Sequence, residues 1–291
     1  MNDPLFTRLH ILTLTATLAV ICVFVTFPGL DLTITRLFYA GAGQFLLDGN
    51  ALAIGLNDTL RIGLTVGFVA VFLTLLLWRF LRITPASGIG NWSFAAVNFL
   101  LGPGLIVNGI LKARVGRARP AHLAEFGGDK HFTPMLEISD QCARNCSFSS
   151  GEVAQTATFV FVALALLWPH LSPRKRWIGG IAGAALTGLS MVLRIGLGRH
   201  FMSDALTSVA LSALVALATY RLCKVAQERP KLTPAALKCD LKATGTALRH
   251  AFHGRRPCDP CFGPGDGKAD NLAPRDCERN IVERLDSAER R

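Results

Sequence analysis

Charged residues are scarce in this chain. Only 18% of its 291 residues are Asp, Glu, Lys or Arg, whereas 51% belong to the hydrophobic set. A disordered protein needs low hydrophobicity and high charge, so this composition excludes that class. Cysteine is also dilute, with 8 residues in the whole chain. A small scaffold held together by disulfides is therefore excluded as well.

The sequence is instead rich in long apolar runs. Six of them are long enough for a membrane helix of roughly 20 residues. They cover residues 9–28, 60–80, 93–111, 150–168, 177–197 and 203–223. The first is expected to be a retained span, because no small-residue cleavage site precedes Pro28. We therefore expect an all-α polytopic membrane protein with a six-helix bundle over 1–223. A cytoplasmic tail over 224–291 is expected to be partly helical and partly flexible.

The positions of the cations predict the orientation of the spans. If the N-terminus is cytoplasmic, most Lys and Arg of the short loops also fall on the cytoplasmic side, as the positive-inside trend requires. The interfacial aromatics agree with this orientation, since all of them lie at predicted cytoplasmic ends. They are Trp78, Trp92, Trp168, Trp177 and Tyr220. Both termini are therefore expected in the cytoplasm.

One group of cations breaks this trend. Lys112, Arg114, Arg117 and Arg119 follow the third span on its outer side, with no acid between them. Membrane topology does not explain charges in that place, so we look for a ligand that does. An anionic group on a lipid or lipid-linked molecule fits, with Arg114 and Arg117 as surface cations. The tail is of mixed sign, which argues against a nucleic-acid partner.

Three polar segments lie at the outer ends of the predicted spans. They read KARVGRARP at 112–120, CSFSSGE at 146–152 and LRIGLGRHFMSD at 193–204. Ionisable residues at such positions are costly, and they are functional candidates for that reason.

The residue types in these segments suit a phosphate group. Arg119 and Arg194 offer planar guanidinium forks, and Lys112 adds a point charge. Ser150 and Gly151 open a predicted helix, whose free N–H groups favour an anion.

His200 and Asp204 are four positions apart, so they share one face of a helix. A carboxylate there can orient the imidazole while the other ring nitrogen attacks. Together with the cations, this pattern indicates phosphoryl transfer with no obligatory metal. No cofactor is expected.

The spaced motifs KX6RP, SG and RX5HX3D resemble those of the type 2 phosphatidic acid phosphatase (PAP2) superfamily. The resemblance covers about residues 9–223 and implies that His200 is the nucleophile, which forms a phosphohistidine, and that Asp204 orients it. It also implies a set of residues that hold the phosphoryl group. This set is Lys112, Arg119, Ser150, Gly151 and Arg194.

The sequence departs from the superfamily pattern at three positions. Ser149 replaces the motif Pro, Leu193 replaces a Ser, and Glu152 replaces the His that serves as general acid. Glu152 could serve as that acid, or it could be a helix N-terminal acid favoured by the helix dipole. His122 or His131 could supply the proton instead. This version of the motif is similar to that of bacterial lipid A phosphatases.

These observations predict a metal-independent lipid phosphatase in a bacterial inner membrane, with its site facing the periplasm. Lipid A is the favoured substrate. The alternatives are an undecaprenyl pyrophosphate or glycerophospholipid phosphatase, a phosphotransferase with the same site, and a non-catalytic phospholipid-binding or transport protein. The sequence does not predict the oligomeric state.

The remaining cysteines leave alternatives open. Cys142 and Cys146 could form a disulfide or remain two loop thiols. In the tail, Cys258-x2-Cys261 raises the question of zinc, together with Cys239, Cys277, His250 and His253. The irregular spacing of these residues favours free thiols instead.

A last helix is predicted in the tail. It starts at Thr233-Pro234 and ends at about His253. Its Leu and Lys pattern suits either a membrane-surface helix or a solvated one.

Overall fold

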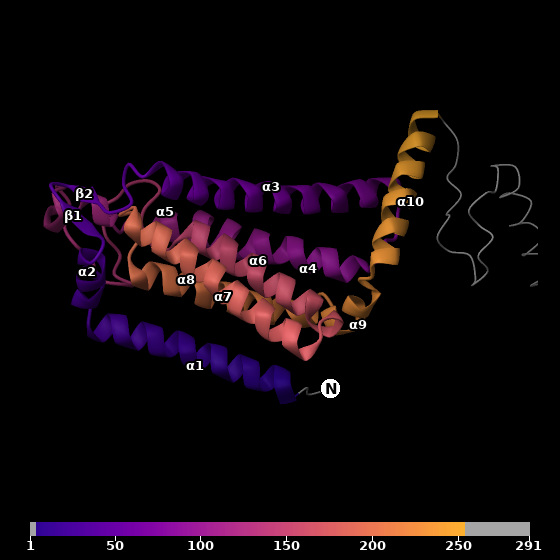
Figure 1. Cartoon of the computed structure of the whole chain (residues 1–291), viewed down its shortest axis with the longest axis horizontal. Coiled ribbons are helices and arrows are strands. Elements are labelled where there is room, and N and C mark those ends of the chain that lie inside the picture. Colours follow the sequence, from indigo (N-terminus) through magenta and orange to yellow (C-terminus); the bar gives the residue numbers. More distant parts are fainter. Residues whose placement is uncertain (1–3, 254–291) are drawn as a thin grey trace, which may run out of the picture.

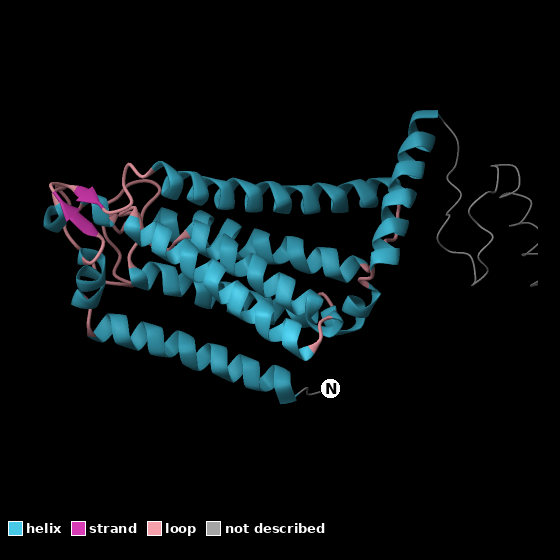
Figure 2. Ribbon diagram, viewed as in Figure 1, coloured by secondary structure: helices cyan, strands magenta, loops and turns pink. Residues whose placement is uncertain are grey.

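The chain is almost entirely helical. The computed structural model describes residues 4–253 (Figures 1 and 2). Its α-helices are α1 Pro4–Thr26, α2 Gly29–Arg36, α3 Ala51–Leu81, α4 Ile89–Phe99, α5 Lys112–Arg114, α6 Gly151–Leu167, α7 Pro173–Gly196, α8 Met202–Leu222, α9 Val225–Glu228 and α10 Pro234–His253. A π-helix covers Leu100–Leu111, and short 3₁₀ turns cover Pro120–His122, Ala124–Phe126, Trp168–His170 and Arg229–Lys231. Strands β1 Tyr39–Gly41 and β2 Gln44–Phe45 form a small antiparallel hairpin.

The prediction of an all-α protein with six spans is confirmed. Six helical segments in the described part are long and apolar enough to cross a membrane. They cover Thr7–Thr26, Ala51–Leu81, Ile89–Arg114, Gly151–His170, Pro173–Gly196 and Met202–Leu222. Most limits differ from the predicted ones by a few residues.

The second span is longer than predicted. It begins at Ala51 because the side chain of Asn50 accepts a hydrogen bond from the Ala53 N–H at 3.0 Å and caps the helix. Asp58, which we expected in the preceding loop, therefore lies inside α3. There it forms an ion pair with Arg61 at 3.1 Å.

The third span changes from α-helix to π-helix at Leu100. Pro103 lies inside the π-helical part and has no N–H to donate. The side chain of Asn108 donates to the Pro103 carbonyl at 2.7 Å, so it satisfies an acceptor within the π-helical turn. Such segments often occur near functional sites, and this one leads directly into Lys112.

The two ends of the bundle differ in structure. The N-terminus, α9 and α10 lie at one end, whereas α2 and the hairpin lie at the other (Figure 1). All four Trp lie in or beside elements that begin or end at the same end of the bundle as α10 (Figure 1). The indole N–H of Trp78, for example, donates to Thr244 of α10 at 2.8 Å.

The tail packs against the bundle at least as far as α10. Val225 is fully buried with Phe94 and Val162, so the packed core extends past the predicted boundary at residue 223. Helix α10 begins where predicted, and the Thr233 hydroxyl accepts from the Ala236 N–H at 3.1 Å. It runs across the end of the bundle (Figure 1). Asp240 of α10 holds the helix in this position, because its carboxylate accepts a hydrogen bond from the Ala86 N–H at 2.6 Å.

Two expectations for the tail have different outcomes. The prediction of a free thiol is wrong for Cys239, which is disulfide-bonded. Cys258, Cys261 and the segment predicted to be flexible after residue 254 lie outside the described residues.

Candidate active site

The three polar segments meet at the end of the bundle opposite α10. Lys112 comes from α5, Glu152 from the first turn of α6 and Arg194 from the last turn of α7. His200 lies in the short link between α7 and α8, and Asp204 lies in the first turn of α8. Residues about 90 positions apart in the sequence are thus brought to one place by antiparallel spans.

The main chain of Ser147 determines which imidazole nitrogen of His200 carries the proton. His200 Nδ1 lies 2.7 Å from the Ser147 carbonyl oxygen. A carbonyl oxygen can only accept, so Nδ1–H is the donor in this bond. In the neutral ring, Nε2 is then the unprotonated nitrogen with a free lone pair.

The environment of His200 keeps the ring neutral. The side chain is fully buried. Burial lowers the pKa of His200 to about 4, and the neighbouring Asp204 opposes this shift only in part. At neutral pH the imidazole is therefore an unprotonated base, which is the form that a nucleophile needs.

Glu152 and Arg194 lie on the Nε2 side of His200. Glu152 Oε2 is 3.9 Å from His200 Nε2, and Glu152 Oε1 is 3.3 Å from an Arg194 guanidinium nitrogen. Arg194 also donates to Asn57 of α3 at 3.4 Å. Several buried polar atoms of this group have no hydrogen-bond partner among the described residues. They are Ser149 Oγ, Glu152 Oε2, Arg194 Nε and His200 Nε2.

The cations of the first motif flank this group. Lys112 is 8% exposed although it carries a charge. Arg119 is partly exposed, and its Nε donates to the Asn145 carbonyl at 3.2 Å. Burial, and then repulsion from Arg199, lower the pKa of Arg119, while Glu152 opposes the shift. An anion placed among these cations would relieve their mutual repulsion.

Ser150 and Gly151 form the start of α6, as predicted. The Ser150 side chain caps the helix by accepting from the Val153 N–H at 3.5 Å. A Cβ on Gly151 would lie 2.7 Å from Asn108 Oδ1. Glycine therefore allows α6 to approach the π-helical segment that leads into Lys112.

Arg117 contradicts the expectation of a surface cation. It is fully buried, and its guanidinium pairs with Asp204 at 2.6 Å and with Asp31 of α2 at 2.9 Å. Its Nε donates to the Thr133 carbonyl at 2.8 Å, and the group lies 4.1 Å from the centre of the Phe201 ring. Arg114, in contrast, is exposed as predicted.

Asp31 and Ser203 complete this buried network, and the sequence reasoning missed both. Asp31 accepts from the Ser203 N–H at 2.9 Å and from its hydroxyl at 2.5 Å. Burial raises the pKa of Asp31, and Arg117 opposes the shift. A lone acid just after the first span was the available signal, since charges at the ends of spans are costly.

Asp204 contacts His200 mainly through Ser147. Its Oδ2 is 3.7 Å from His200 Nδ1, which is beyond hydrogen-bond distance. The same oxygen accepts from the Ser147 hydroxyl at 2.5 Å, and the Ser147 N–H donates to the Arg117 carbonyl at 2.9 Å. Asp204 and Arg117 thus hold the residue whose carbonyl orients the imidazole.

The loop before Ser147 is closed by a disulfide between Cys142 and Cys146. His122 and His131, the other proton donors that we considered, are both exposed. Neither ring is hydrogen-bonded or ion-paired to the site within the described structure. No group of three or more metal-ligating side chains occurs in residues 4–253.

Comparison with known proteins agrees with this geometry. The model of the PAP2 superfamily matches residues 91–228. A lipid A 4′-phosphatase of Francisella tularensis subsp. novicida is 32% identical over 62% of this chain and 80% of its own length. This chain belongs to the PAP2 superfamily. As a PAP2 protein with six apolar helices, it is a membrane phosphatase, a phosphoric monoester hydrolase.

Further relatives of this PAP2 protein are named for two different activities. A lipid A 4′-phosphatase of Rhizobium leguminosarum is 30% identical over 68% of this chain and 91% of its own length. A lipid A 1-phosphatase of Rhizobium etli is 35% identical, but over 46% of this chain and 50% of its own length. No solved structure matches the chain.

Proposed function

We propose that this PAP2 protein removes the 4′-phosphate from lipid A at the outer face of the bacterial inner membrane. The observation that carries the proposal is the free lone pair of His200 Nε2, which faces Glu152 and lies in a group that includes Arg194 and Lys112. The choice of lipid A rests on the relatives. Those that align over 80% or more of their length are lipid A 4′-phosphatases, whereas the 1-phosphatases align over about half.

In the first step, His200 Nε2 attacks the phosphorus. The Nε2–P bond forms while the bond between phosphorus and the sugar oxygen breaks. The phosphate oxygens take the Arg194 guanidinium from Glu152, since both are anions that compete for the same donors. The Glu152 carboxylate, now beside Nε2, takes the proton of the phosphate monoanion and passes it to the leaving sugar oxygen, so Glu152 ends the step ionised again.

In the second step, water attacks the phosphohistidine. Glu152 takes a proton from the attacking water and passes it to the departing phosphate, so the carboxylate of the resting state is restored. The Nε2–P bond breaks and inorganic phosphate is released. Lys112, Arg119 and Arg194 stabilise the charge that develops on the phosphoryl oxygens in both steps.

Expression in a Gram-negative host whose lipid A carries both phosphates tests the proposal. Mass spectrometry of the extracted lipid A is expected to show the loss of one phosphate, and fragmentation should place the loss at the 4′ position. Loss at the 1 position would contradict the assignment of the phosphate. An unchanged lipid A profile with well-expressed protein would contradict lipid A as substrate.

His200→Asn tests the nucleophile and has a matched control. The Asn amide can still donate to the Ser147 carbonyl, but it lacks the Nε2 lone pair, so phosphate release should fall to the uncatalysed background. His131→Asn makes the same exchange at an exposed loop position, and it should leave activity at the wild-type level. An active His200→Asn protein would rule out the phosphohistidine.

A further inference from the structure

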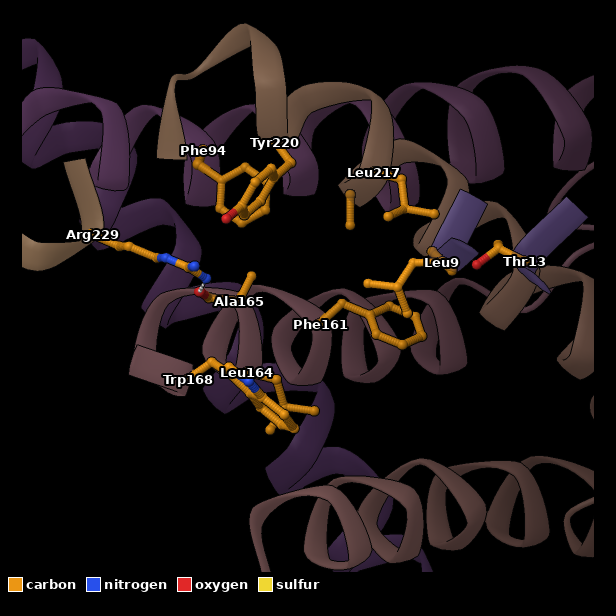
Figure 3. Close-up of a pocket in the computed structure, with 12 residues that line it drawn as sticks. Leu9, Thr13, Phe94, Phe161, Leu164, Ala165, Trp168, Leu217, Tyr220 and Arg229 are labelled. Carbon is orange, nitrogen blue, oxygen red and sulfur yellow. Dashed lines mark hydrogen bonds between the residues drawn. The ribbon is translucent and has the colours of Figure 1, made fainter. Parts of the chain in front are cut away.

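A cavity lies at the end of the bundle opposite His200. Its volume is about 400 Å³, which falls within the range of about 300–1,000 Å³ that is common for ligand sites. Figure 3 shows its walls, to which Leu9 and Thr13 of α1, Phe161 of α6 and Leu217 of α8 contribute. Trp168, Tyr220 and Arg229 lie at its other side. The lining is apolar except for a few groups, of which Arg229 carries a full charge.

The cavity lies within the membrane-spanning part of the chain and beside a loosely packed helix. No residue of α1 from 7 to 23 is buried, whereas Phe24 at its far end is. Leu9 and Thr13 therefore cover the cavity without closing a tight helix interface over it. In a bilayer, an apolar space of this kind next to lipid is filled by hydrocarbon.

Arg229 gives the cavity a polar end. One of its guanidinium nitrogens donates to the Ala165 carbonyl at 3.3 Å, and the group lies 5.7 Å from the centre of the Tyr220 ring. No carboxylate pairs with it in the described part of the chain, since the neighbouring Glu228 pairs with Lys231 at 2.7 Å. Its remaining donors can take a phosphate. Other cations gather at this end of the bundle, namely Arg174, Lys175, Arg176 and Lys224.

We propose that this cavity binds one anionic phospholipid from the membrane leaflet opposite the active site. An acyl chain lies between α1, α6 and α8, and the phosphate lies at Arg229. The aromatic rings of Trp168 and Tyr220 stand at the level where an apolar site meets a polar headgroup, which is the position such rings favour in membranes. The occupant is a bound lipid and not a substrate, because His200 lies at the other end of the bundle.

Photolabelling of the full-length protein tests this proposal. The probe is phosphatidylglycerol with a photoreactive group on its acyl chain, and phosphatidylcholine with the same chain is the comparison lipid. Peptide mapping is expected to place the phosphatidylglycerol adducts on α1, α6 and α8 around Leu9, Phe161 and Leu217. Arg229→Gln should lower this labelling roughly tenfold, as expected when a charge-assisted hydrogen bond is lost. Lys175→Gln, at an exposed cation of the same end, should not lower it.

A second pair of variants tests the cavity itself. Ala213→Trp fills it, because Ala213 lines the wall, and labelling there should disappear. Ala184→Trp adds the same side chain at an exposed position of α7 and should leave labelling unchanged. Phosphate release should be the same in all four variants, which verifies that each is folded. Equal labelling by both lipids, or labelling that survives both Ala213→Trp and Arg229→Gln, would overturn the proposal.

Discussion

At His200 the protein places an imidazole between a main-chain carbonyl on one side and a carboxylate on the other. The carbonyl of Ser147 takes the proton of Nδ1, so the nitrogen that faces Glu152 is the basic one. Burial then removes the competing proton at neutral pH, because it lowers the pKa of the ring to about 4. Two separate features of the structure thus favour a free lone pair on the same atom, as the proposed attack on phosphorus requires.

The pKa of His200 predicts a pH dependence of stability. The folded-state pKa of about 4 lies below the unfolded value of 6.5, so the unfolded chain binds a proton first as the pH falls. Wild type should lose stability between pH 6.5 and about 4, by about 2 kcal/mol at pH 5 relative to pH 7. His200→Asn lacks the titrating group and should lose less over the same interval. Apparent melting temperatures of both proteins at pH 7 and pH 5 check this, and parallel curves would contradict it.

Glu152 occupies the place of the motif histidine, and its proposed role leads to a prediction about turnover. Glu152→Gln keeps the size of the side chain but cannot transfer a proton, so turnover should fall by about 10²–10⁴-fold. Because the first step needs an acid and the second a base, both phosphohistidine formation and its hydrolysis should slow. Rapid-quench measurements with lipid A can separate the two steps. Wild-type rates in Glu152→Gln would show that Glu152 is a helix N-terminal acid without a role in proton transfer.

Between elements, Arg117 links helix α2, the loop after α5 and the start of α8. Its two carboxylate partners, Asp31 and Asp204, are as buried as Arg117 itself. Their charges are compensated within the network. The second oxygen of each carboxylate accepts a further hydrogen bond, from the Ser147 hydroxyl to Asp204 and from the Ser203 N–H to Asp31. This arrangement ties the first motif to the third through a residue that belongs to neither motif pattern.

Arg117→Met should therefore destabilise the protein strongly. It leaves two buried carboxylates without their cation, and breaking a buried pair in this way costs about 3–5 kcal/mol. Arg117→Lys keeps the charge but not the fork, so we expect an intermediate loss. Arg114→Gln, at the exposed arginine three positions earlier, is the matched control and should change stability little. Apparent melting temperatures of the four proteins check the order, and similar values for Arg117→Met and Arg114→Gln would contradict it.

The contrast between Arg114 and Arg117 shows how much of the structure could be predicted from the sequence. Long apolar runs predicted all six spans, because hydrophobicity over roughly 20 residues is a local property. The partners of Arg117 are not local, since Asp31 and Asp204 are each more than 80 positions away. Nothing in the KARVGRARP segment distinguishes a buried arginine from an exposed one. In the same way, the motif spacing predicted that His200 and Asp204 lie close together. It did not predict that Ser147 links them.

At the scale of the whole molecule, the site depends on helices outside the part that matches the superfamily model. That match begins at residue 91, whereas Asp31 comes from α2 and Asn57, which accepts from Arg194, comes from α3. The first two spans and the α2 segment thus help to hold the residues of the motifs. A truncation to the matched residues would remove both partners.

The opposite character of the two ends leads to a prediction about orientation. The end with His200 is expected outside and the end with α10 inside, since the cations of the short loops gather at the latter. Glu137 and Lys175 are exposed residues of the two ends. In cells stripped of the outer membrane, an impermeant maleimide should label Glu137→Cys at once. It should label Lys175→Cys only after the inner membrane is opened. The wild-type protein corrects for the free thiols of Cys22 and Cys223. The reverse pattern would place the candidate active site in the cytoplasm and would contradict action at the outer face.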